Sequence, residues 1–182
     1  DGFDSLCYDG QKFFDEEHPV FANADGTGTK SLVSNIYKKT NSDSSSAWFL
    51  LSLNRPLKPF ILQQRTGMEM ESITDTKNDT VFTKDLYQYG IRWRGNFGYG
   101  LWQQALASKA ELNADNFEAA LAQSQSFKRD GGDPMGIRPT ALVVPASLEA
   151  AARKILERDT LENGEGNINY HVVELIVNPW LS

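Results

Sequence analysis

The stretch GIRPTALVVPASLEAAARKIL, residues 136–156, contains the clearest structural signal in the chain. Residues 140–144 form a short apolar run that is typical of a buried strand. From Ser147 onward, the apolar residues follow the spacing of one helix face, at positions 148, 151, 152, 155 and 156. A last strand is predicted at residues 170–177, after a glycine-containing loop. The order strand–helix–strand fits either a parallel βαβ crossover or an α+β lobe.

Another helix is predicted just before this stretch. Asn113 can cap its first turn, and Gly131 and Gly132 are expected to end it. Its apolar stripe consists of Phe117, Ala120, Leu121 and Phe127.

The first half of the chain is richer in strand and loop signals. Strands are predicted at residues 48–51, 59–62 and 81–94, and a bend or bulge at the glycine-rich residues 95–102. Residues 1–30 are expected to be irregular, and residues 40–46 to form a polar surface loop.

Composition narrows the class of protein. The 182 residues suit one domain or a domain with a lobe, and the formal net charge of −6 argues against nucleic acid as the main partner. The single cysteine excludes an intrachain disulfide, and no apolar run approaches the length of a membrane span. The chain opens on Asp1 and its first methionine is Met68, so we expect it to lack the N-terminus of a longer gene product.

An acidic segment beside a histidine is the strongest candidate for catalysis. Asp15, Glu16, Glu17 and His18 have side chains that can bind a metal or share acid–base chemistry. Consecutive residues do not converge on one point, however, so a solvated turn with a structural His18 is the preferred interpretation. His171 is predicted to be a satisfied histidine in the core or at the edge of the last strand.

The remaining candidates have simpler structural explanations. Cys7 has no histidine nearby in the sequence and is expected to be a small buried residue. Residues 130–133, Asp-Gly-Gly-Asp, lack the spacing of a calcium-binding loop. Residues 78–80 match a glycosylation sequon, which has no role in a cytosolic protein.

Aromatic side chains alternate along the predicted strand at residues 81–94. Tyr87, Tyr89 and Trp93 share one face and, with Tyr99, could form a sugar-binding platform, although such stripes more often belong to a core. Arg92 and Arg94 lie on the opposite face and could meet a carboxylate of a partner subunit. We therefore predict no catalytic, cofactor-binding or metal site, and no enzyme.

Several segments in a fixed order resemble the major head subunit of Mu-like phages and prophages. They are YDGQKFFDEEHPVFANADGTG (8–28), SLNRPLKPFILQQR (52–65), DTVFTKDLYQYGIRWRGNFGYGLWQQALA (79–107) and GIRPTALVVPASLEAAARKIL (136–156). Each segment alone is common, whereas their combination is specific and extends over nearly the whole chain.

The resemblance implies an α+β Hong Kong 97-like capsid fold, with a mixed sheet flanked by helices. It implies an axial domain with part of the peripheral domain, while the family's arm, extended loop and spine helix precede the opening segment. Within the fragment 1–182, residues 1–112 would be the strand- and loop-rich part, 113–135 a peripheral-type helix and 136–182 the axial-type part.

The same resemblance implies a structural role with no catalytic residues. Copies of the subunit would form hexamers and pentamers of an icosahedral head around DNA bound only non-specifically. Scaffold and head-maturation proteins are the other expected partners, and no membrane is involved. Assembly would occur in the bacterial cytoplasm, and the final location would be the virion. The alternatives are a metal-dependent hydrolase at residues 15–18 and a carbohydrate-binding tail module at residues 87–99.

Overall fold

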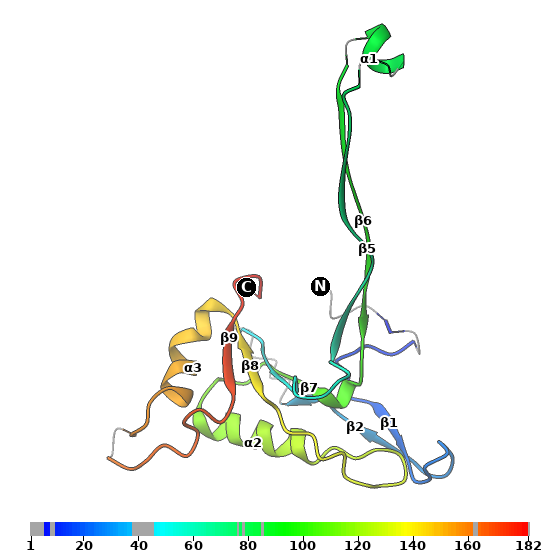
Figure 1. Ribbon diagram of the computed structural model, residues 1–182. Coiled ribbons are helices and arrows are strands. Elements are labelled where there is room, and N and C mark those ends of the chain that lie inside the picture. Colours follow the sequence, from blue (N-terminus) through cyan, green and yellow to red (C-terminus); the bar gives the residue numbers. More distant parts are fainter. Residues whose placement is uncertain are drawn as a thin grey trace. The chain divides into compact units, whose positions relative to one another are not determined.

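The computed structural model describes residues 6–7, 10–37, 46–75, 77, 79–84, 86–161 and 164–181. These residues divide into two compact units (Figure 1). Unit 1 contains the described parts of Asp1–Pro59 and Tyr99–Ser182, and unit 2 is Phe60–Gly98. The predicted surface loop at residues 40–46 lies almost entirely outside the described residues.

Unit 1 is built on a mixed five-stranded sheet. In spatial order the strands are β3 (Ile36–Tyr37), β7 (Ala105–Ser108), β4 (Trp48–Leu51), β8 (Ala141–Val144) and β9 (Glu174–Val177). The central strand β4 runs antiparallel to both β7 and β8, and Leu50 lies opposite Leu106 on one side and Leu142 on the other. The edge strands β3 and β9 run parallel to their neighbours. All four residues of β4 are buried, because both faces of the sheet are covered.

Two helices cover one face of this sheet. They are α2 (Ala114–Gln125) and α3 (Glu149–Leu156), the latter entered through the short turn η3 (Ala146–Leu148). Their buried side chains form one core cluster with alternate residues of the strands: Trp48, Leu50, Leu106, Leu142, Val144, Phe117, Ala120, Ala152, Ile155 and Leu156. Because α3 connects the parallel pair β8 and β9, the strand–helix–strand order is a βαβ crossover.

The opposite face of the sheet is covered by the N-terminal segment. Phe13 and Phe14 are buried there against Phe49, Leu51 and other sheet residues. The same segment leads into a small antiparallel pair, β1 (His18–Phe21) and β2 (Lys30–Val33). Residues 1–30, predicted to be irregular, therefore contain a strand and a buried aromatic pair.

Unit 2 is a long two-stranded ribbon. Its strands are β5 (Phe60–Ile73) and β6 (Gln88–Tyr99), whose last residue belongs to unit 1, and the short helix α1 (Asp79–Lys84) lies between them. After β6, the turn η2 (Trp102–Gln104) leads into β7. A ribbon of this length was not expected from the sequence.

Several predicted elements are confirmed. Strands occur at residues 48–51 and 141–144, and Asn113 caps α2 by accepting a hydrogen bond from the backbone N–H of Asn116 at 2.8 Å. The mixed sheet with helices on one face and the α+β class agree with the sequence analysis.

The predicted end of the first helix is wrong. The helix α2 stops at Gln125, where the Ser126 N–H bonds back to the carbonyls of Ala122 and Gln123. Gly131, with φ of +89°, instead donates its N–H to the Phe21 carbonyl, and the Asp130 carboxylate accepts from the Phe21 N–H at 2.8 Å. The Asp-Gly-Gly-Asp turn therefore anchors β1.

The predicted strand at residues 81–94 is also wrong at its start. Residues 79–84 are helical, and the strand begins at Gln88 and continues through the glycines to Tyr99, where a bend or bulge was expected. The last strand is shorter than predicted, because His171 adopts a left-handed φ of +52° in an exposed turn before β9.

The boundaries at residues 112/113 and 135/136 do not separate compact units. The helix α2 packs on β7 and β4, in the same unit as residues 136–161 and 164–181. The assignment of residues 113–135 to a peripheral part and of residues 136–182 to an axial part stays a prediction.

Candidate assembly interface

The ribbon of unit 2 has two faces of different chemistry. Successive side chains of a strand point to opposite faces, so even and odd residues separate along each strand. At the base of the ribbon, the Gly100 N–H donates to the Pro59 carbonyl at 2.9 Å, which sets Pro59 opposite Gly100. Odd residues of β5 therefore share a face with even residues of β6.

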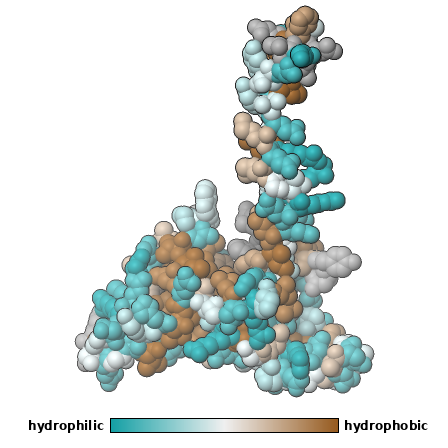
Figure 2. Space-filling model, in the orientation of Figure 1, coloured by the Kyte–Doolittle hydropathy of each residue, from teal (hydrophilic) through white to brown (hydrophobic). Residues whose placement is uncertain are grey.

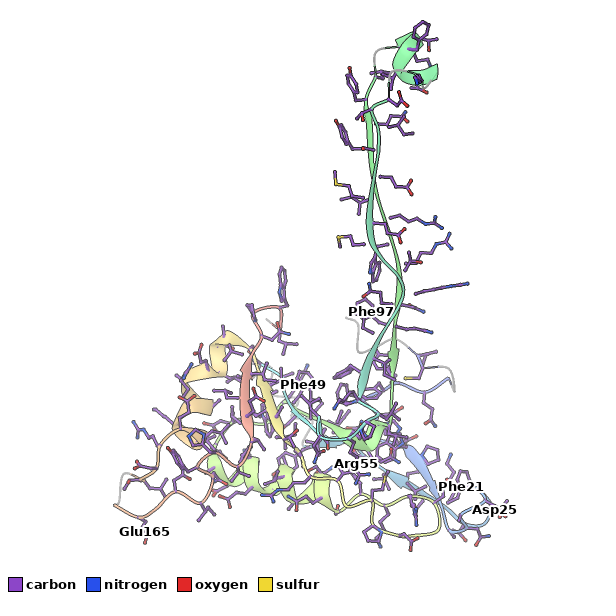
Figure 3. The ribbon with its side chains drawn as sticks, viewed as in Figure 1. Phe21, Asp25, Phe49, Arg55, Phe97 and Glu165 are labelled. Carbon is purple, nitrogen blue, oxygen red and sulfur yellow. The ribbon has the colours of Figure 1, made fainter. Side chains whose placement is uncertain are left out.

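The apolar face contains the even residues of β5 and the odd residues of β6. Its most exposed large side chains are Leu62, Met68, Met70, Tyr89, Ile91, Trp93 and Phe97. Each is between 42% and 77% exposed. Figure 3 shows sulfur- and ring-bearing side chains along one edge of the ribbon, and Figure 2 shows hydrophobic residues along that edge. An exposed apolar strip of this length is typical of a surface that becomes buried in an assembly.

The charged face contains Arg65, Glu69 and Glu71 from β5 and Arg92 and Arg94 from β6. These side chains are exposed, and within the described part of the chain no ion pair or hydrogen bond satisfies them. Long side chains with nitrogen or oxygen tips lie along the other edge of the ribbon in Figure 3. The predicted separation of the aromatic residues from Arg92 and Arg94 is thus confirmed.

The acidic segment with His18 forms a structural network. Glu16 and Glu17 are exposed, whereas His18 is buried in β1 and stacks on Trp102 with ring centroids 4.2 Å apart. The imidazole also contacts the Asn35 side-chain oxygen, which lies 3.3 Å from Nε2. His18 is structural, as preferred, but it lies in a strand and not in a solvated turn.

Asn35 is the centre of this network. Its fully buried side chain donates to the Phe13 carbonyl at 2.8 Å and accepts from the Asp15 N–H at 2.9 Å. Its own backbone groups bond to Asp15 and Ala107. Through its side chain and its backbone, Asn35 therefore joins the N-terminal segment, β1 and the sheet.

We expect Asn35→Ala to lower the free energy of unfolding of unit 1 by about 2–4 kcal/mol, because it leaves more than one buried polar group without a partner. The measurement is urea unfolding followed by circular dichroism. Replacement of the exposed Asn96 by alanine is the control and is expected to change the unfolding by less than about 0.5 kcal/mol. Equal effects of the two substitutions would contradict the assignment of Asn35 as the centre.

Cys7 is half-buried and lies at the rim of a cavity in unit 1. The cavity has a volume of about 260 Å³ and is lined by Cys7, Lys12, Phe13, His18, Tyr99, Gly100 and Trp102. Tyr99 stacks on Phe13 here, with ring centroids 4.7 Å apart, so it belongs to the core and not to the exposed aromatic series. Among the described residues, the lining is mainly aromatic and includes no carboxylate.

The other candidate residues do not converge on a site. His171 is exposed and contacts the Tyr170 ring, and Asn78 lies outside the described residues. Among the residues that the structure describes, no group of three or more His, Cys, Asp or Glu side chains is placed to hold a metal ion. No helix in the described part is long and apolar enough to span a bilayer.

Two exposed groups have shifted pKa values for local reasons. The Asp25 carboxylate accepts hydrogen bonds from the Thr27 hydroxyl and from the Thr27 N–H. Both bonds lower the pKa of Asp25, and the hydroxyl has the larger effect. Hydrogen bonds to Glu157 and to Glu149 raise the pKa of Arg153 on α3, and the bond to Glu157 has the larger effect. These contacts fix a turn and one face of α3, where Arg153 forms i,i+4 ion pairs with Glu149 and Glu157.

The fold is that of a phage capsid subunit. The procapsid of bacteriophage JBD30 contains a chain with a TM-score of 0.85 and 44% identity, over 99% of this chain and 60% of that chain. The JBD30 capsid matches with a TM-score of 0.75 and 28% identity, over 100% of this chain and 59% of that chain.

Sequence comparison identifies the family. The profile of the Mu-like prophage major head subunit gpT matches residues 1–181, and the chain belongs to this family. It is 46% identical over 158 residues to the Mu-like prophage FluMu major head subunit of Haemophilus influenzae, covering 87% of this chain and 51% of that protein. It is 39% identical over 184 residues to the major capsid protein of Escherichia phage Mu, covering 100% of this chain and 60% of that protein.

These comparisons confirm the resemblance and the capsid fold. The chain spans about half to three fifths of the length of these relatives. The comparisons give no support to the alternatives of a hydrolase or a carbohydrate-binding module.

Proposed function

We propose that this chain is part of a structural subunit that self-assembles into the icosahedral head of a Mu-like phage or prophage. The apolar face of the ribbon is the observation that carries the proposal. Seven large apolar side chains on this one face are more than 40% exposed, and an isolated two-stranded ribbon is only marginally stable in water. In a shell, neighbouring subunits would cover the apolar face and so stabilise the ribbon.

The expected assembly consists of hexamers and pentamers of one protein. Scaffold and head-maturation proteins are the proposed helpers, with assembly in the bacterial cytoplasm. DNA would be enclosed without specific contacts, which is consistent with the net charge of −6. A shell needs self-complementary surfaces and no catalytic site, so we propose that the protein is not an enzyme.

The test is assembly of the complete gene product that contains this chain. The protein would be expressed with its neighbouring head genes and analysed by sedimentation and negative-stain electron microscopy. We expect closed shells or their precursors. A protein that stays monomeric at all concentrations, with or without the other head proteins, would contradict the proposal.

A further inference from the structure

We propose that the charged face of the ribbon pairs with the same face of a second copy, across a twofold axis. The proposal rests on the proposed function, because it names the partner of one surface within the shell. It is carried by the order of charges along the ribbon, which is self-complementary.

Three arginines gather toward the base of the ribbon. Arg65, Arg92 and Arg94 share the charged face, one on β5 and two on β6. We call them the basic cluster. Like charges close together on neighbouring strands repel each other. None of the three arginines forms an ion pair within the described part of the chain, so a partner that brings carboxylates would relieve this repulsion.

Two glutamates lie next to the basic cluster on the same face. Glu69 and Glu71, the acidic pair, follow Arg65 along β5. At about 3.3 Å per residue, Glu69 lies about 13 Å from Arg65 along β5. The face therefore carries a positive and a negative block of similar size, side by side.

An antiparallel second copy matches these blocks twice. If the twofold axis passes near residue 68 of β5, Arg65 of each copy lies opposite Glu71 of the other. An isologous contact of this kind makes each favourable pair twice, because both copies use the same patch.

The charged face also contains two glycines. Gly67 and Gly90 lie on this face, and the space where a side chain of Gly90 would extend is open. A side chain at Gly67 would meet only the flexible end of Gln64. These two positions leave room on the face for the long charged side chains of the second copy.

A nucleic acid fits the same face less well. The acidic pair would lie beside any phosphate bound to the basic cluster. Residues 60–98 contain five Lys or Arg (65, 77, 84, 92, 94) and five Asp or Glu (69, 71, 75, 79, 85), so unit 2 has no basic surplus. Affinity for phosphate requires such a surplus.

The experiment uses complementary charge reversals in the complete gene product. One variant carries Arg65→Glu and Arg92→Glu, so its charged face is mainly acidic. A second variant carries Glu69→Arg and Glu71→Arg, so its face is basic. A third variant carries all four changes. The control, Lys30→Glu with Lys154→Glu, alters the net charge as much as the first variant but at exposed positions of unit 1.

We expect each of the first two variants alone to yield about tenfold fewer particles, because like charges now face each other. A mixture of the two, and the four-change variant, should recover particles, whereas the control should assemble like the unchanged protein. Circular dichroism would verify that each variant is folded.

Three results would overturn the proposal. Normal assembly of the basic variant by itself would indicate that the charged face binds nucleic acid and not a second copy. Normal assembly of both variants, or no recovery in the mixture and the four-change variant, would remove the pairing but leave the shell function intact. Failure of the unchanged protein to assemble would instead refute the proposed function, and with it this pairing.

Discussion

Replacement of Trp48 by alanine is expected to lower the free energy of unfolding of unit 1 by about 3–5 kcal/mol. Trp48 is fully buried in the central strand β4 and packs in the core cluster between the sheet and its helices. Its indole N–H also donates to the Ala110 carbonyl at 2.8 Å. The substitution leaves both a large cavity and a buried carbonyl without its donor, so the effect should lie toward the upper end of this range.

Two further variants separate these contributions. Trp48→Phe keeps most of the apolar volume but loses the hydrogen bond, and should cost less than Trp48→Ala. Trp180→Ala removes the same side chain at a position that is 90% exposed and should change the unfolding by less than about 0.5 kcal/mol. Urea unfolding followed by circular dichroism measures all three. Similar midpoints for Trp48→Ala and Trp180→Ala would refute the described core.

Replacement of Met70, Tyr89 and Ile91 by serine is expected to reduce particle yield by tenfold or more, since each buried side chain of this size contributes about 1.5–3 kcal/mol. The three residues lie on the apolar face and are 71%, 65% and 69% exposed. The stability of unit 1 should not change, because none of them belongs to its core. Sedimentation of the complete gene product measures the yield, and urea unfolding measures the stability.

A matched control uses Leu32→Ser with Ile168→Ser. These residues are also large, apolar and more than half exposed, but they lie in unit 1. We expect a much smaller loss of particles. An equal loss in both variants would indicate that general surface polarity, and not the apolar face, controls assembly.

The core of unit 1 could be predicted from local patterns. Residues 140–156 join an apolar run to a helix with clear 3.6-residue spacing, and the structure forms β8, η3 and α3 there. Local signals sufficed because each element buries the face that its own sequence makes apolar.

The ribbon was missed for a physical reason. Half of the residues of β5 are polar, since the strand lacks a core to face, and only Met68 to Glu71 alternates strictly between apolar and charged residues. Together with the alternation at residues 87–94, this short segment was the only sequence pattern that could have indicated two paired strands. Asn35 could not be identified, because its partners Phe13 and Asp15 are at least 20 residues away. The turn at His171 depends on a left-handed backbone that apolar runs do not predict.

The most direct test of the central claim is oxidative footprinting of Met68 and Met70 in free subunits and in assembled particles. Both side chains are more than 70% exposed in the structure, whereas Met135 in unit 1 is half-buried and serves as an internal reference. If the apolar face is buried by assembly, Met68 and Met70 oxidise rapidly in free subunits and slowly in particles, relative to Met135. Equal oxidation of Met68 and Met70 in both states would contradict the account.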